Sequence, residues 1–251
     1  MADKMELSNK ASAIRRKLGE DESSPIDIFS LAQTIPLLTL IFYPLGNNIS
    51  GACLKNSISA VIAINSEMSI GRQRFSLAHE LYHYFFDKNM SSTICSSKIG
   101  SGSENEENAD KFASYFLIPS VALYEMIQSC KQGQERKLLV SEIIKLEQYF
   151  GVSRRAMLYR LQEEGEITVS ESIGLQQGVI NSAARLGYDV SLYKPSPEIK
   201  RTCVLGHYIL QAENLLQNEI ISNGKYEELL LDAFRDDIVY GEDTEGGDFI
   251  D

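Results

Sequence analysis

Residues of high β-propensity concentrate in three short runs within the first third of the chain. The runs 38–43, 50–54 and 60–65 are separated by turn-forming residues, Gly46-Asn47-Asn48 and then Lys55-Asn56-Ser57. Such runs predict β-strands. Because the connections between them are only a few residues long, we expect the three strands to form a small antiparallel sheet.

Apolar residues recur every three to four positions over most of the remaining chain, which predicts helices. One of these begins at Ser24, where a capping side chain precedes Pro25 at the first helical position. The Ser/Gly-rich stretch 91–103 predicts a loop, and the glycines and acids of 241–251 predict a disordered tail. Helices are expected at 8–18, 24–34, 69–86, 104–116, 120–129, 141–150, 153–164, 203–219 and 226–237.

The order of these elements predicts an α+β fold in three parts. Residues 1–125 hold the sheet and the helices that pack on it, and 126–170 form a helical region that resembles a helix-turn-helix. Residues 171–251 form a C-terminal helical extension with an acidic tail. With 43% apolar and 24% charged residues, the 251-residue chain is able to bury a sizeable core.

Charge and cysteine content indicate which binding partners and which cellular compartment are expected for this chain. Of the net charge of −11, residues 227–251 carry ten acids and one arginine, so the body is nearly neutral and its bulk charge predicts no affinity for nucleic acid. The apolar stretch 35–45 is shorter than the roughly 20 residues that span a bilayer, and no signal sequence is visible. Four cysteines without paired spacing indicate free thiols. We expect a cytoplasmic protein without membrane contact.

The candidate chemistry lies in the segment His79-Glu80-Leu81-Tyr82-His83, which holds two of the three histidines in the chain. Residues four apart lie on one face of a helix, so His79 and His83 are able to grip one metal ion. Glu80 lies about 100° further round the helix, where its carboxylate reaches a water on the metal rather than the metal itself. The segment therefore predicts a catalytic zinc site with Glu80 as acid and base.

A catalytic zinc has three protein ligands, and the next predicted helix offers three carboxylates for the third position. Glu106 is favoured over Glu104 and Glu107, because it lies near the face formed by the small residues Ala109 and Ala113. Those alanines would let this helix pack closely on the helix that carries the histidines. The other interpretation of Glu106 is a solvated acid near a helix N-terminus.

These segments resemble the ImmA/IrrE family of metallo-endopeptidases, which are gluzincin-like proteases with an HExxH motif. The resemblance implies a zincin-like fold in which zinc, or else manganese, is bound by His79, His83 and Glu106, with Glu80 as the catalytic acid and base. It implies as substrate a helix-turn-helix transcriptional repressor whose cleavage relieves repression, and a toxin–antitoxin role is a related alternative. The resemblance rests on Arg72–His83, Glu106-x-x-Ala109-Asp110-x-Phe112-Ala113, Phe116–Pro119, Pro25–Ile28, Ser50-Gly51 and Ile64-Asn65, with Asp110 where the family usually has Asn.

Two further features of the expected site follow from general protease chemistry. A donor to the oxyanion is needed, and Tyr82 and Tyr84 are candidates only because they are near in sequence. If the strand 60–65 is a sheet edge, the substrate could bind to it as an added strand.

Cys95 invites a redox or cysteine-switch role, but a small loop residue is the favoured interpretation.

The stretch 146–167 supports an alternative function. Gly151 suits a tight turn, Ser153 suits a helix cap, and Arg154, Arg155 and Arg160 would give the second helix a basic side. A DNA-binding regulator with a catalytically silent metal site would place this helix in the major groove. We favour a packing role for these helices, because acids follow them directly at 163, 164 and 166, and we therefore expect no direct DNA binding.

Overall fold

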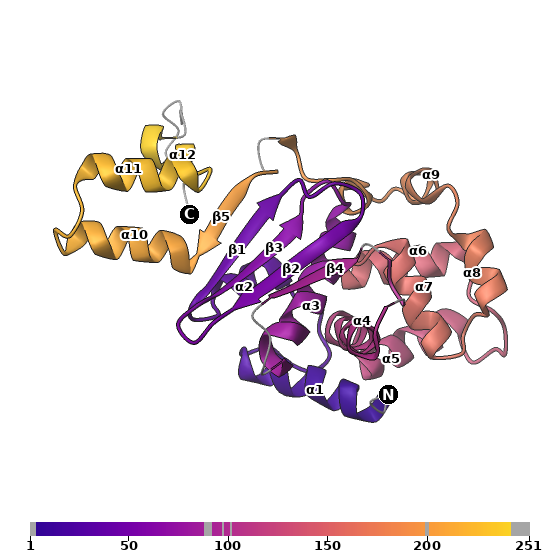
Figure 1. The fold of residues 1–251 in the computed structure, drawn as a ribbon. Coiled ribbons are helices and arrows are strands. Elements are labelled where there is room, and N and C mark those ends of the chain that lie inside the picture. The colour runs from indigo at the N-terminus through magenta and orange to yellow at the C-terminus, as the bar shows by residue number, and fades with distance from the viewer. Residues whose placement is uncertain (1–3, 88–91, 97, 101, 199–200, 242–251) are drawn as a thin grey trace.

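The computed structural model describes residues 4–87, 92–96, 98–100, 102–198 and 201–241 (Figure 1). Except for Gly241, the predicted disordered tail lies outside the described residues. The described chain forms one five-stranded sheet with helices against it, so the expected α+β fold is confirmed. No helix among these residues is long and apolar enough to cross a bilayer.

The three predicted strands are confirmed, but the purely antiparallel sheet is wrong. The sheet has the order β4-β2-β3-β1-β5, and β1 runs parallel to β3 while the other pairs are antiparallel. Residues 44–48 therefore carry the chain past the end of β3 instead of forming a hairpin. The strands are β1 Leu38–Tyr43, β2 Ile49–Lys55, β3 Ala60–Asn65, β4 Ser92–Ser96 and β5 Cys203–Gly206.

Asn65 explains why the chain crosses in this way. Its side-chain amide donates to the carbonyl oxygens of Gly46 at 2.5 Å and Ile49 at 2.7 Å, and its side-chain oxygen accepts from the Leu45 amide at 3.2 Å. One buried side chain at the end of β3 therefore satisfies three backbone groups of the crossing loop, which would otherwise lack partners. Pairing of β1 with β3 depends on this contact between residues some twenty positions apart.

Most helices fall near where the periodicity placed them. The predicted helix 8–18 begins earlier, at Lys4, the predicted helix 24–34 begins later, at Ile28, and the predicted helix 203–219 begins with β5. The predicted helix 226–237 is two helices, α11 and α12, and the predicted loop 91–103 contains β4. Helices α8 and α9 and the 3₁₀-helix η1 had no prediction. The helices are α1 Lys4–Lys17, α2 Ile28–Gln33, α3 Ile70–Phe86, α4 Glu104–Leu117, α5 Ser120–Lys131, α6 Val140–Phe150, α7 Arg154–Glu163, α8 Val169–Leu175, α9 Val179–Arg185, η1 Ser191–Tyr193, α10 His207–Gln217, α11 Asn223–Asp232 and α12 Asp236–Tyr240.

The late start of α2 has a local cause. The carboxylate of Asp27 caps this helix by accepting from the Phe29 amide at 3.2 Å, and it also accepts from the Ser30 hydroxyl at 2.6 Å. Ser24 instead offers its carbonyl oxygen to the buried guanidinium of Arg15 on α1. The helix therefore begins after Asp27, which supplies its cap, and not after Ser24.

Helix α3 lies under the sheet and forms the centre of the fold (Figure 1). One side of it packs against β2 and β3, α4 packs on it from another side, and α1 packs on α4. Ala109 and Ala113 of α4 are fully buried, as expected for a close contact between α3 and α4. The helix that carries His79 and His83 therefore lies between the sheet and α4.

Helices α6 and α7 form the predicted turn and pack on the start of α3. Gly151 has the left-handed conformation, φ 63°, and the Ser153 hydroxyl caps α7 by accepting from the Ala156 amide. A β-carbon on Gly71 of α3 would lie 2.6 Å from the Ser153 nitrogen, so only glycine permits this contact. Leu146 and Leu161 are buried in the same hydrophobic core as α3 and α4. The domain boundaries at 125 and 170 stay predictions.

The basic side predicted for α7 is wrong for two of its three arginines. Arg154 is 3% exposed and Arg160 is fully buried, whereas Arg155 is exposed. Arg160 donates to the Ile118 carbonyl oxygen at 3.2 Å and lies over the ring of Tyr115. Burial of these two arginines is tolerated because the packed structure supplies partners for their charged groups. A sequence does not show these partners.

Candidate metal centre

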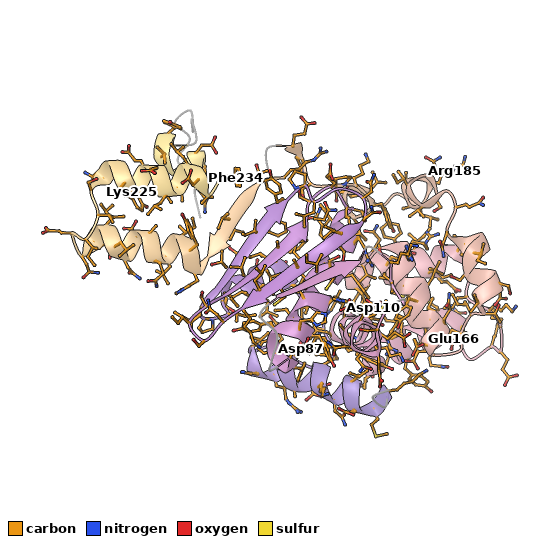
Figure 2. The ribbon with its side chains drawn as sticks, in the orientation of Figure 1. Asp87, Asp110, Glu166, Arg185, Lys225 and Phe234 are labelled. Atoms are coloured by element: carbon orange, nitrogen blue, oxygen red, sulfur yellow. The ribbon has the colours of Figure 1, made fainter. Side chains whose placement is uncertain are left out.

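Helix α3 brings His79 and His83 together on one face, as their spacing predicts. Their Nε2 atoms lie 3.2 Å apart and face the same point. Each Nδ1 lies against a carboxylate: His79 against Asp110 at 2.8 Å and His83 against Asp87 at 2.7 Å. Figure 2 labels both aspartates on the side of the sheet that carries α3 and α4. When a metal ion is bound, these contacts would keep a ring hydrogen on each Nδ1 and leave each Nε2 to donate its electron pair to the ion.

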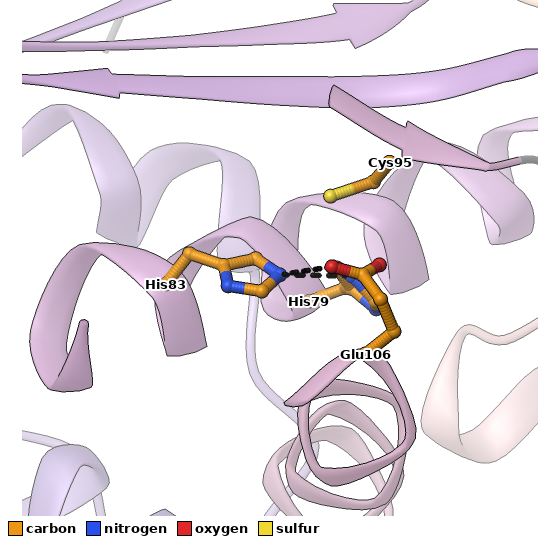
Figure 3. Close-up of side chains that lie close together, drawn as sticks. All are labelled: His79, His83, Cys95 and Glu106. Carbon is orange, nitrogen blue, oxygen red and sulfur yellow. Dashed lines mark hydrogen bonds and ion pairs between the residues drawn. The ribbon is translucent and has the colours of Figure 1, made fainter. Parts of the chain in front are cut away.

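Glu106 reaches the same point from the first turn of α4 (Figure 3). One of its oxygens lies 3.2 Å from His79 Nε2, and the other lies 3.5 Å from His83 Nε2. The hydrogen bond with His79 lowers the pKa of the Glu106 carboxyl, so it is ionised. The group of potential metal ligands within the described residues includes Glu106 and neither Glu104 nor Glu107.

The donor set fits a small divalent cation. Two imidazole electron pairs and a carboxylate that face one another at 3.2–3.5 Å repel unless a positive charge lies between them. Tetrahedral zinc with bonds of about 2.0–2.1 Å would place its ligand atoms about 3.3–3.4 Å apart. Although burial lowers it, the hydrogen bonds to Asp110 and Glu106 raise the pKa of His79 to about 10. The surroundings therefore favour a positive charge at this point, which a metal ion would supply.

Glu80 lies beside this group and is not part of it. Its side chain is fully buried, and neither carboxylate oxygen has a hydrogen-bond partner. Burial raises the pKa of Glu80 to about 7, against the opposing charge of His79. An unpartnered buried carboxylate with a pKa near neutrality is suited to accept and return a proton.

Cys95 is the member of the group for which the sequence analysis favoured another interpretation, that of a small loop residue. It lies on β4 rather than in a loop, is fully buried, and places its sulfur among the ligand atoms of His79, His83 and Glu106. The ligand atoms of these four residues lie within 4.8 Å of one another. Burial and the charge of Glu80 hold the pKa of the Cys95 thiol well above its usual range. The sequence suggested a cysteine-switch role only as the less favoured alternative, because a single cysteine in a Ser/Gly-rich stretch does not indicate a strand.

The two aspartates behind the histidines were also missed as site residues, although a signal was present. Asp87 follows His83 by four residues and Asp110 follows Glu106 by four, so each lies one turn away on the same helix face. Asp110 has a second role, because its other oxygen accepts from the Gly100 amide at 2.6 Å. It thereby fixes the segment between β4 and α4 as well as the ring of His79.

The two tyrosines named as candidate oxyanion donors lie outside the group of potential metal ligands in the described residues. Tyr82 is 5% exposed, and its ring packs against Phe86 and Phe112 in the core. Tyr84 lies under the ammonium group of Lys55. Neither is in the ligand group of the described residues.

An HExxH helix packed under a mixed sheet, with a glutamate from the following helix, defines a zincin-like metallopeptidase fold. The sequence profile of the peptidase M78 family, described as the IrrE N-terminal-like domain, matches residues 38–162. The chain belongs to this ImmA/IrrE family of metallopeptidases, and the expected membership is confirmed. No curated protein matches the chain.

Proposed function

We propose that this protein is a metal-dependent endopeptidase that cleaves a helix-turn-helix repressor and so relieves repression. The observation that carries the proposal is the convergence of His79, His83 and Glu106 beside the unpartnered carboxylate of Glu80. Membership of a metallopeptidase family supports the reaction class. The choice of a repressor as substrate rests on the family resemblance.

The residues of this chain would divide the chemistry between them. His79, His83 and Glu106 would hold the metal, and zinc when bound would polarise the scissile carbonyl and acidify a water molecule. Asp110 and Asp87 keep the proton of each imidazole on Nδ1 and thereby aim Nε2 at the ion. Glu80 would accept the proton of the attacking water on a carboxylate oxygen and deliver it to the leaving amine.

We propose a position for the substrate that differs from the sequence expectation. Strand β3, Ala60–Asn65, is not an edge but lies between β2 and β1. The outer strand on the side of the metal centre is β4, which carries Cys95 and pairs with β2. An extended substrate would add to the free edge of β4 by main-chain hydrogen bonds, which places its backbone beside the ligand group.

The structure offers little to the DNA-binding alternative. Two of the three arginines that would contact phosphates, Arg154 and Arg160, are buried in contacts within the protein. The expectation that this chain does not bind DNA directly stays a prediction, and the buried arginines support it.

Metal content tests the centre. Elemental mass spectrometry should find about one zinc or manganese ion per wild-type chain and a large loss in His83→Ala. His207→Ala is the matched control, because this histidine lies on α10, outside the ligand group. Wild-type protein that takes up no metal even from added zinc would overturn the proposal.

The substrate class needs a separate experiment. Lysates of source cells, incubated with zinc-loaded wild-type protein or with Glu80→Gln, would be compared by mass spectrometry of newly formed protein N-termini. We expect a new N-terminus inside a helix-turn-helix repressor with the wild-type protein alone. A Glu80-dependent cut in proteins of another class would retain the protease and reject the repressor. No Glu80-dependent cut, either by the wild type or by a Cys95→Ser variant that lacks the sulfur beside the ligand group, would reject both.

A further inference from the structure

The sulfur of Cys95 occupies the side of the metal centre that faces the sheet. His79, His83 and Glu106 approach from α3 and α4, and Cys95 approaches from β4 on the opposite side (Figure 3). Its sulfur and their ligand atoms lie within 4.8 Å of one another. Two nitrogens, one carboxylate oxygen and one sulfur, drawn from three elements, are a complete ligand set for tetrahedral zinc.

The position of Cys95 follows from the architecture and not from a mobile side chain. Cys95 pairs with Gly51 across the β4–β2 ladder, and its backbone carbonyl lies 3.4 Å from the Ser50 hydroxyl. Gly51 is also the residue against which Glu80 packs. The fully buried Cys95 thiol and Glu80 carboxylate therefore lie beside each other at the ligand group.

We propose that the Cys95 thiolate is a fourth ligand of the metal, which closes the centre and keeps the enzyme latent until this sulfur is displaced. This inference rests on the metal centre of the proposed function. Ligation forms a sulfur–metal bond, and the thiol proton leaves to the solvent without any electron transfer. A structural zinc site has four protein ligands, whereas a catalytic one keeps a position free for water or substrate. Cys95 would fill that free position.

X-ray absorption at the zinc edge distinguishes the two states directly. The wild-type protein, loaded with one equivalent of zinc, should show one sulfur neighbour at about 2.3 Å together with nitrogen and oxygen neighbours. Cys95→Ser should bind zinc without a sulfur neighbour. Cys53→Ser is the matched control, because Cys53 is a buried cysteine on the neighbouring strand β2, and it should keep the sulfur signal.

A small zinc-binding probe tests whether the fourth position is closed. Acetohydroxamate binding to the cobalt-substituted proteins, followed by the visible cobalt spectrum, needs an open position on the metal. We expect binding to Cys95→Ser to be about tenfold or more tighter than to wild type and Cys53→Ser. Equal binding to all three would overturn the latency.

The outcomes separate this inference from the proposed function. Zinc with only nitrogen and oxygen neighbours in the wild type overturns the role of Cys95 and leaves the metal centre standing. Sulfur retained in Cys95→Ser also overturns it, whereas no zinc in any variant overturns both. If Cys95→Ser does not fold, a sulfur neighbour in both wild type and Cys53→Ser supports the inference, and its absence from the wild type rejects it.

Discussion

Gly51 on β2 lies against Glu80 on α3 so closely that a β-carbon on Gly51 would be 2.8 Å from the Oε1 atom of Glu80. The same β-carbon would lie 3.0 Å from the Ala63 carbonyl oxygen on β3. The sheet therefore approaches the active-site helix at a residue without a side chain. This absence of a side chain is what leaves room for the buried carboxylate.

The Gly51→Ala variant should lose activity while it keeps its metal. The methyl group would push the Glu80 carboxylate out of place, and overpacking of this kind costs about 1–3 kcal/mol of stability. We expect kcat/KM for a verified substrate to fall by about 10–100-fold with unchanged zinc content. Gly174→Ala on α8 is the control, because a β-carbon there meets nothing within 4 Å. Wild-type activity in Gly51→Ala would show that the contact does not position Glu80.

The Glu80→Gln variant separates metal binding from turnover. Glutamine has the same size, but it neither accepts the proton of water nor returns it to the leaving amine. We expect the rate to fall by roughly 10²–10⁴-fold or more, with about one metal ion still bound per chain. Rates come from gel analysis of the cleaved substrate, and metal from elemental mass spectrometry. Cleavage at the wild-type rate would show that another group is the base.

The Asp110 variants test whether a hydrogen bond or a charge orients His79. Asp110→Asn retains an oxygen that accepts from His79 Nδ1, so we expect zinc affinity within about tenfold of wild type. Asp110→Ala removes this acceptor, and loss of such a partner typically costs 10–100-fold in metal affinity. Competition with a zinc chelator measures both. A larger loss in Asp110→Asn than in Asp110→Ala would contradict the role assigned to the hydrogen bond.

Arg154 and Arg155 are adjacent in sequence and give opposite predictions. Arg154 pairs with the fully buried Glu147, which also accepts from the Tyr193 hydroxyl at 2.7 Å. Arg154→Met leaves Glu147 as a buried charge without its cation and should cost about 3–5 kcal/mol of unfolding free energy. Arg155→Ala, on the exposed side of α7, should change it by no more than about 0.5 kcal/mol.

Urea unfolding measures both arginine variants, and DNA binding at two salt concentrations completes the comparison. The packing role predicts instability in Arg154→Met and no salt-dependent duplex binding in the wild type. Two results would favour a DNA-binding regulator instead. These are an Arg154→Met protein as stable as the wild type, and duplex binding by the wild type that Arg155→Ala weakens.

Local sequence patterns predicted much of this fold and the central residues of its candidate site. The three strand runs, most helices and the HExxH spacing depend on periodicities within a few residues, and the structure agrees with them. Ala109 and Ala113 identified the close face of α4, and with it Glu106 was favoured over Glu104 and Glu107. Each of these features is encoded by neighbours along one element, so the sequence displays it directly.

Tertiary structure decided the features that join distant segments. Nothing local distinguishes β1 beside β2 from β1 beside β3, because the choice depends on Asn65 binding the crossing loop. From the sequence alone, Arg154 is expected to be a solvated basic side chain. The tertiary structure instead buries it next to Glu147, which also accepts from Tyr193. The sequence by itself determined the helix pair that brings His79, His83 and Glu106 together. Only the packing of β4 against that pair brought Cys95 to the same point, because pairing between strands depends on contacts across the fold that local pattern does not encode.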